Sequence, residues 1–137
     1  MSYAMAAGLQ QAVYQHLIDD AAVAAGLGGA IYDVLPAGAL PQVYAVLGQE
    51  EARDASDKTG AGARHEFSVA VISDGSGYLQ AKTAAAAICD ALVDADLALP
   101  RGRLVALRFL RARARQEGAG QIRRIDLRFA ARLEDDE

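Results

Sequence analysis

The sequence predicts an α+β two-layer sandwich, in which about four mainly antiparallel strands form a sheet and two main helices pack on one of its faces. Two observations support this prediction. Residues 42–49, 64–73 and 101–133 alternate apolar and polar side chains, which is typical of half-buried strands. Residues 3–19 and 78–95 space their apolar side chains three or four apart, as amphipathic helices do.

Length and composition indicate one domain over residues 1–137. The formal charge of −4 argues against nucleic-acid binding by bulk electrostatics, although the positive charges concentrate after Arg101. The last four residues, 134–137, are acidic and are expected to form a frayed, solvated end. Cys89 lies in an apolar helical pattern and is expected to be a small buried hydrophobe. Because no run of about 20 apolar residues is present, we expect no membrane association.

The N-terminal third is predicted to be helical and then extended. Residues 3–19 form the first helix, with Ser2 as its N-cap. Residues 21–29 (AAVAAGLGG) add one or two helical turns that stop at the glycines. A short extended piece at 30–34 follows, and two prolines then frame the loop 35–41, which cannot belong to a central strand.

Two strands, 42–49 and 64–73, flank the longest polar interior segment, residues 54–62 (DASDKTGAG). This composition cannot bury itself, so we expect an exposed loop. The segment is interpreted either as an ordinary hairpin connection or as a flexible arm that becomes ordered on meeting a partner. His65 is expected near the exposed end of the apolar face of its strand, without a metal role.

The helix 78–95 presents a narrow stripe of small apolar residues, which permits close approach to a sheet. The chain then forms a long hairpin, 101–133, with its turn at 117–120. On its first strand, one face is expected to carry three apolar residues followed by three arginines, namely Val105, Leu107, Phe109, Arg111, Arg113 and Arg115.

Residues suited to catalysis do not converge in this sequence. The two histidines lie in different elements, and the serines lie outside any nucleophile-elbow pattern. Glu50 and Glu51 are consecutive, so on a strand they point to opposite faces and cannot act as a carboxylate pair. No zinc, calcium or dinucleotide motif is present. We therefore predict no catalytic, cofactor-binding or metal site and no enzymatic activity.

The arginines of the hairpin form a compact positive end. A charged, solvent-facing surface that keeps a sheet soluble is the simplest interpretation. The alternative is self-assembly, in which this end meets an acidic element of the next subunit, such as Glu50 and Glu51 or the C-terminal tail, and such contacts close into rings. The candidate interface residues are Glu50, Glu51, Asp54, Ser56, Asp57, Lys58, Thr59, Gly60, Arg111, Arg113, Arg115, Arg123 and Arg124.

A family resemblance is carried by Ile31-Tyr32-Asp33 with Pro36, by the loop DKTG at 57–60, and by the strand pair with RFL at 108–110 and RRI at 123–125. On these residues the chain resembles the tail terminator, or tail completion, family of long-tailed bacteriophages and phage-derived gene transfer agents. The resemblance extends over nearly the whole sequence.

This resemblance implies an α+β subunit of a hexameric ring at the head-proximal end of a tail tube. Such a ring stops tube polymerisation, docks the connector proteins of the head, and lets DNA pass through its channel without sequence-specific binding. Neither catalysis nor a cofactor belongs to that role. The protein would assemble in the host cytoplasm and end in the neck of the particle, with residues 54–62 contacting the tube or a neighbouring subunit.

Two other functions remain open from the residues alone. A small dimeric ligand-binding or enzymatic domain would show a deep apolar pocket with converging polar groups. A nucleic-acid binder would use the arginine end, and its affinity for DNA would fall steeply with salt. The acidic total charge argues against the second function.

Overall fold

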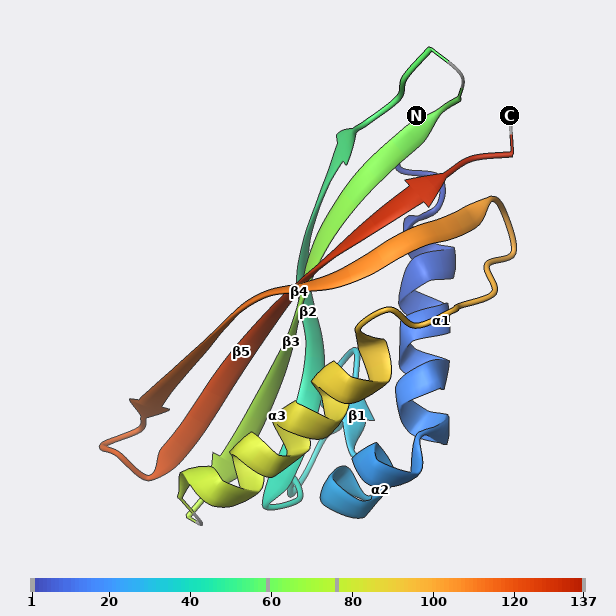
Figure 1. Cartoon of the computed structure of the whole chain (residues 1–137). Coiled ribbons are helices and arrows are strands. Elements are labelled where there is room, and N and C mark those ends of the chain that lie inside the picture. The colour runs from blue at the N-terminus through green and yellow to red at the C-terminus, as the bar shows by residue number, and fades with distance from the viewer. Residues whose placement is uncertain (1, 59, 76, 137) are drawn as a thin grey trace.

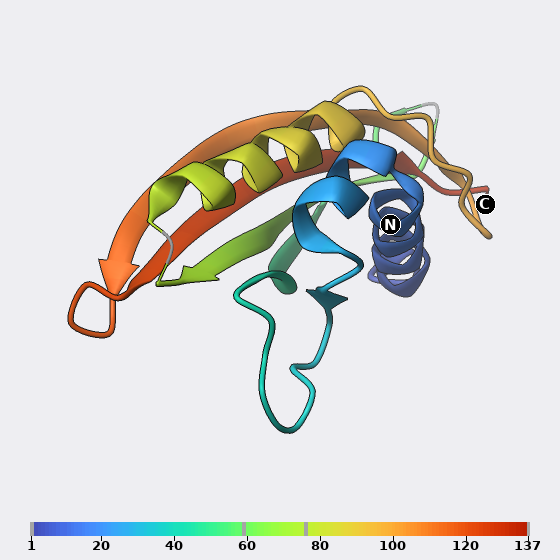
Figure 2. The ribbon, with the colours of Figure 1, turned by 90° about the horizontal axis from the view of Figure 1, so that it is seen from below.

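The computed structural model describes residues 2–58, 60–75 and 77–136, so Thr59 and Glu137 lie outside the described residues. The elements that it describes follow one another as α1 (Ala6–Asp19), α2 (Ala21–Leu27), β1 (Ile31–Tyr32), β2 (Val43–Asp54), β3 (Gly62–Asp74), α3 (Tyr78–Leu92), β4 (Arg103–Glu117) and β5 (Ile122–Glu134). The strands form one sheet in the order β1-β2-β3-β5-β4. The helices cover one face of this sheet and leave the other face open (Figures 1 and 2).

The predicted α+β two-layer class is confirmed, but the sheet differs in one strand. The extended piece after α2 joins it as β1, which pairs in parallel with β2 through Ile31 opposite Ala45. The sheet therefore has five strands and is mixed. β1 is bound firmly because Ile31 is buried in the core.

The helical layer contains α2 in addition to the two main helices. The Asp20 carboxylate accepts a hydrogen bond from the amide of Val23 at 3.0 Å, and Gly28 ends the helix with a left-handed φ of 58°. The first helix starts at Ala6, later than predicted, and Met5 occupies its N-cap position. Ser2 instead accepts a hydrogen bond from the amide of Ala4.

β2 and β3 form a longer hairpin than the sequence predicts. Their pairing continues as far as Asp54 opposite Ala63, so only residues 55–61 remain at the tip. The tip is itself hydrogen bonded, because the amide of Ala55 donates to the carbonyl of Gly62 at 2.9 Å. This geometry confirms a hairpin connection. Ordering of the segment by a partner stays a prediction.

Two β-bulges in β4 overturn the predicted arrangement of its faces. The pairing of β4 with β5 shifts once between Leu104 and Ala106 and again between Phe109 and Arg111. Each extra residue reverses the alternation, so the arginines that follow Leu110 lie on the face opposite to Phe109. The prediction that the arginines continue the apolar face is therefore wrong. Val105, predicted on that face, is the first extra residue and is 42% exposed.

Phe129 of β5 lies at the centre of the core. Its side chain is completely buried, with its ring stacked on Phe67 at 5.6 Å and edge-on to Phe109 at 6.0 Å. We expect Phe129→Ala to lower the free energy of unfolding in urea by about 3–5 kcal/mol, because the cavity cannot close fully. Leu79→Ala, at an exposed position, is the control and should change it by under about 0.5 kcal/mol. Equal losses in the two variants would contradict this account of the core.

Candidate functional site

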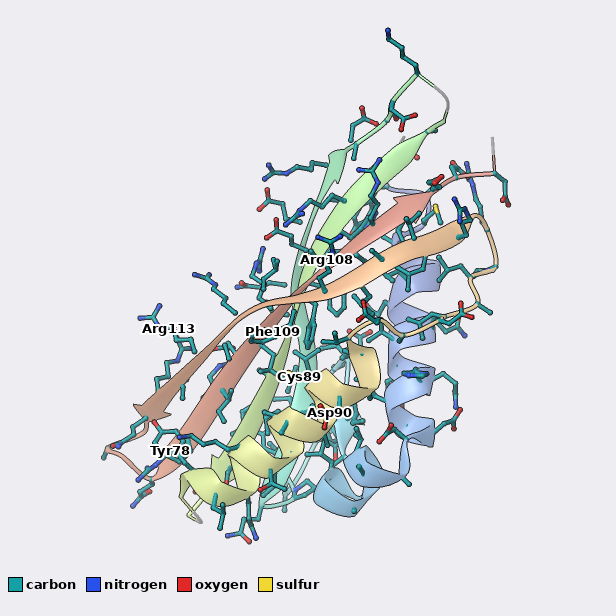
Figure 3. All side chains as sticks on the ribbon, in the orientation of Figure 1. Tyr78, Cys89, Asp90, Arg108, Phe109 and Arg113 are labelled. Atoms are coloured by element: carbon teal, nitrogen blue, oxygen red, sulfur yellow. The ribbon has the colours of Figure 1, made fainter. Side chains whose placement is uncertain are left out.

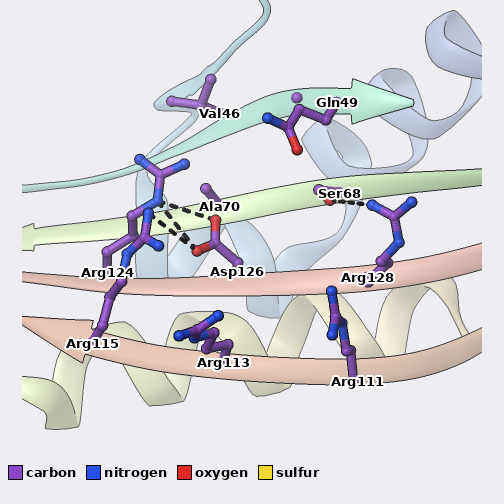
Figure 4. A pocket seen from close by; sticks show the side chains of 11 residues that line it. Val46, Gln49, Ser68, Ala70, Arg111, Arg113, Arg115, Arg124, Asp126 and Arg128 are labelled. Carbon is purple, nitrogen blue, oxygen red and sulfur yellow. Dashed lines mark hydrogen bonds and ion pairs between the residues drawn. The ribbon is translucent and has the colours of Figure 1, made fainter. Parts of the chain in front are cut away.

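The open face of the sheet contains a hollow of about 320 Å³ between β2 and β4. Because the second bulge turns the end of β4 outward, arginines from β4 and β5 reach this hollow together (Figure 4). We call it the arginine hollow, and its lining consists of Val46, Gly48, Gln49, Ser68, Ala70, Arg111, Arg113, Arg115, Arg124, Asp126 and Arg128.

The register of β4 on β5 sets like charges against one another in the arginine hollow. Arg111 lies opposite Arg128, and Arg115 lies opposite Arg124. Like charges in directly opposed positions destabilise a sheet. Only Arg113 has an acidic partner in register, which is Asp126. Without nearby acidic groups, this register would therefore destabilise the pairing of β4 with β5.

Acidic groups neutralise only the two ends of the arginine hollow. Asp126 lies 3.1 Å from Nε of Arg124 and 3.7 Å from Nη2 of Arg115. At the other end, Nε of Arg128 lies 3.2 Å from Glu66. Between them, the side chains of Arg111 and Arg113 make no hydrogen bond or ion pair with residues 2–58, 60–75 or 77–136. Both side chains are exposed, and Asp126, which lies opposite Arg113 in the register, pairs with Arg124 and Arg115 instead.

Two arginines on the open face lower the pKa of the Glu66 carboxyl. Hydrogen bonds from Arg128 and from Arg64, both at 3.2 Å, hold the pKa of this carboxyl below its usual range. Glu66 therefore stays ionised near neutral pH.

The structure separates two arginines that the sequence analysis grouped together. Arg124 lines the arginine hollow, whereas its neighbour Arg123 lies on the helix side, 5.0 Å from the ring of Tyr78, and donates to the carbonyl of Gly120. Arg128 belongs to the hollow but was absent from the predicted site. The alternation of β5, which places it on the same face as Arg124, was the signal that could have found it.

Glu50 and Glu51 point to opposite faces, as predicted. Glu50 faces the helices, accepts a hydrogen bond from the hydroxyl of Tyr3, and lies 2.9 Å from Nδ1 of His65. Glu51 lies on the open face and pairs with Arg53 at 2.7 Å. Of the two, only Glu51 is exposed for contact with a partner.

His65 is completely buried, so the prediction that it lies near an exposed end is wrong. The reason is a distant segment, because the ring of Tyr3 stacks over the imidazole with centroids 6.0 Å apart. The hydrogen bond and the negative charge of Glu50 also raise the pKa of Tyr3. These three residues tie the N-terminal segment to the sheet.

The candidate residues at the β2–β3 tip lie away from the arginine hollow. In Figure 1 this tip and the β4–β5 turn project from opposite ends of the sheet. Within the tip, Ser56 donates to Asp54 at 2.7 Å, and Asp57 accepts from the amide of Gly60 at 3.0 Å. The side chain of Lys58 is exposed. The tip is thus a second, separate candidate surface.

The acidic C-terminal tail is bound to its own chain as far as Asp136. Glu134 ends β5 and pairs with Arg103 at 2.8 Å. Asp135 pairs with Arg101 at 2.7 Å, and Asp136 accepts a hydrogen bond from the amide of Gly102. The expectation of a frayed end is therefore wrong for residues 134–136. Their charges are already engaged.

Metal-binding clusters and membrane-spanning helices are both absent from the residues that the structure describes. These residues hold no group of three or more His, Cys, Asp or Glu side chains that could bind a metal ion. No helix among them has both the length and the apolar character needed to cross a membrane.

Residues 11–134 match the family model described as tail completion protein gp17. The comparison with curated proteins found no match. Among solved structures, the chain is similar to a chain of the "Virion of native gene transfer agent (GTA) particle", with a TM-score of 0.92 and 58% sequence identity. This similarity covers 97% of the present chain and 99% of that chain.

Proposed function

Because this chain belongs to the tail completion protein gp17 family, we propose that it is a ring subunit that closes the head-proximal end of a tail tube. The ring stops further polymerisation of the tube protein and offers a docking face to the head connector. DNA passes through its channel without sequence-specific binding. The role is structural and requires no reactive centre, cofactor or membrane.

The similarity to a chain of a gene transfer agent virion supports this placement. A fold shared at 58% identity over nearly the full length of both chains is consistent with the same kind of particle. We propose that the chain assembles in the host cytoplasm and then remains at the neck of the particle as a hexamer. Its partners are copies of itself, the tube protein and the connector.

The observation that carries the proposal is that Arg111 and Arg113 are exposed and form no ion pair within the described residues. The whole chain has a formal charge of −4, yet these two arginines form a bare positive surface on the edge strand β4. A surface of this kind fits an acidic partner surface more closely than a small-molecule pocket. The arginine hollow is open and charged, whereas ligand sites are mostly apolar and enclosed.

Electron microscopy of particles produced without this chain tests the proposed function. We expect overlong tails, or tails without heads, because nothing stops the tube or joins it to the connector. Restoring the chain from a plasmid should restore both the length and the heads. Tails of normal length that are joined to heads in the absence of this chain would contradict the proposal.

A further inference from the structure

The loop between β1 and β2 is an exposed apolar projection. Residues 34–41 (VLPAGALP) contain no charged side chain, and Val34 is 80% exposed while Leu35 is 46% exposed. Figure 2 shows this loop extending away from the body of the protein. An apolar segment presented in this way is a typical contact site for another protein.

An apolar groove lies at the opposite edge of the sheet, between α3 and β4. It has a volume of about 280 Å³ and is lined by four alanines together with Lys82, Cys89, Phe109, Ile125 and Leu127. The groove stays open because the side chains of α3 along it are small, so the ring of Phe109 remains 43% exposed. Figure 3 shows Cys89 on α3 and Phe109 on β4 close to this edge.

Acidic side chains lie beside the loop, whereas the end of the groove nearest Tyr78 carries two cations. Asp33 begins the loop, and Asp74 shares a shallow hollow with Leu40 near its end. Lys82 lines the groove, and Arg123 lies beside it, because both cations lie about 5 Å from the ring of Tyr78. The loop also lies in a part of the sequence without basic residues, because residues 1–52 contain no lysine or arginine.

We propose that the β1–β2 loop of one copy docks into the α3–β4 groove of the next copy. Val34 and Leu35 enter the groove, and Asp33 approaches Lys82. The inference rests on the proposed ring and names the surfaces that form it. Because β1 and β4 are opposite edges of the sheet, the contact is head-to-tail, and repetition of such a contact closes a ring.

The chain cannot fill its own groove with this loop. Between β1 and β4 lie β2, β3 and β5, and four strand spacings amount to roughly 19 Å. The acidic tail is also engaged elsewhere, through Arg101 and Arg103. The occupant must therefore come from another molecule, and a second copy carries both the apolar segment and the matching charge.

Disulfide trapping tests this contact, because the only cysteine of the chain already lines the groove. Val34→Cys should form a bond with Cys89 of the next copy in isolated tails or particles, which yields a ladder of linked subunits on non-reducing gels. Burial, together with the nearby Asp90 carboxylate, raises the pKa of the Cys89 thiol. Oxidation is therefore carried out at mildly alkaline pH with a copper catalyst.

Two controls make the result specific. Leu79→Cys places a thiol with matched exposure, 79% against 80%, on α3 itself and not on the β1–β2 loop, so it should not reach Cys89 of another copy and should give no ladder. Val34→Cys combined with Cys89→Ser should also give none. A ladder in either control, or only monomers from Val34→Cys in tails that contain the ring, would overturn the inference and leave the proposed function intact. Bonds to the tube protein instead would overturn it as well.

A second variant measures how much the contact contributes. Leu35→Glu should weaken ring assembly by about tenfold or more, since burial of one such side chain is lost. Its fold should be unchanged, because Leu35 is 46% exposed and is not part of the buried core. Assembly at the wild-type concentration would contradict the docking of this loop.

Discussion

Replacement of both Arg111 and Arg113 by glutamate is expected to weaken the association of neighbouring subunits by about a hundredfold or more. The two side chains lie on the edge strand β4, which faces the next copy in the proposed ring. Reversal places negative charge where the proposed function puts an acidic partner surface, and like charges across an interface cost several kcal/mol. Light scattering over a range of protein concentrations measures the shift.

The subunit itself should tolerate this double reversal. Both side chains are exposed and make no ion pair with the described residues, so the free energy of unfolding should change by under about 0.5 kcal/mol. The matched control replaces both arginines by lysine, which keeps the charge and should keep most of the association. An unchanged scattering curve for the glutamate variant would show that the arginine hollow takes no part in ring closure.

Deletion of residues 56–60 is expected to give a folded protein that cannot cap tails. The β2–β3 ladder continues to Asp54 opposite Ala63 without these residues, so the hairpin can close with a shorter connection. Circular dichroism and the urea midpoint should therefore stay close to the wild-type values. In particles, tails should be as long as those made without the chain, because the projecting tip is lost.

Replacing residues 56–60 by a loop of the same length made of glycine and serine tests whether the contact depends on the length of the tip or on its side chains. If Asp57 and Lys58 make the contact, this variant should fail as the deletion does. Tails of normal length and normal particle function with the deletion would show that the β2–β3 tip is an ordinary hairpin connection.

Much of the architecture could be predicted because the strands alternate in a regular way. In β5, Ile125, Leu127 and Phe129 are buried on the helix side, as their spacing predicts. The family was also predicted, from short motifs, and the match over residues 11–134 confirms it. Local periodicity and motif chemistry thus determine most of the secondary structure, the layering and the family.

The misplaced residues share a physical cause, which is dependence on a distant partner. A bulge is visible only in the pairing of two strands, so the run from Phe109 to Arg115 looks continuous although Leu110 reverses its faces. β1 has only two residues, too few for a periodic pattern, and forms because β2 accepts it. His65 is buried by a tyrosine more than sixty positions earlier in the chain.

The sequence predicts which types of residue form the candidate site, but only part of their arrangement in space. The sequence indicates a basic hairpin end, but the outward turn after Leu110 is what brings Arg111 and Arg113 beside Arg128. Acidic partners within one chain cannot be assigned from sequence either. Glu50 and the C-terminal tail, both predicted as acidic docking elements, are engaged inside the subunit.

Tail length measured in a reconstituted assembly tests the central claim most directly. The tube protein is first polymerised in the absence of this chain, and the sample is divided into two halves. Purified chain is added to one half, and both halves are then imaged by electron microscopy. The account predicts that growth stops, with a ring at one end of each tube, and that these tubes then join heads. Continued growth at the same rate in both halves, with no ring at the tube ends, would contradict it.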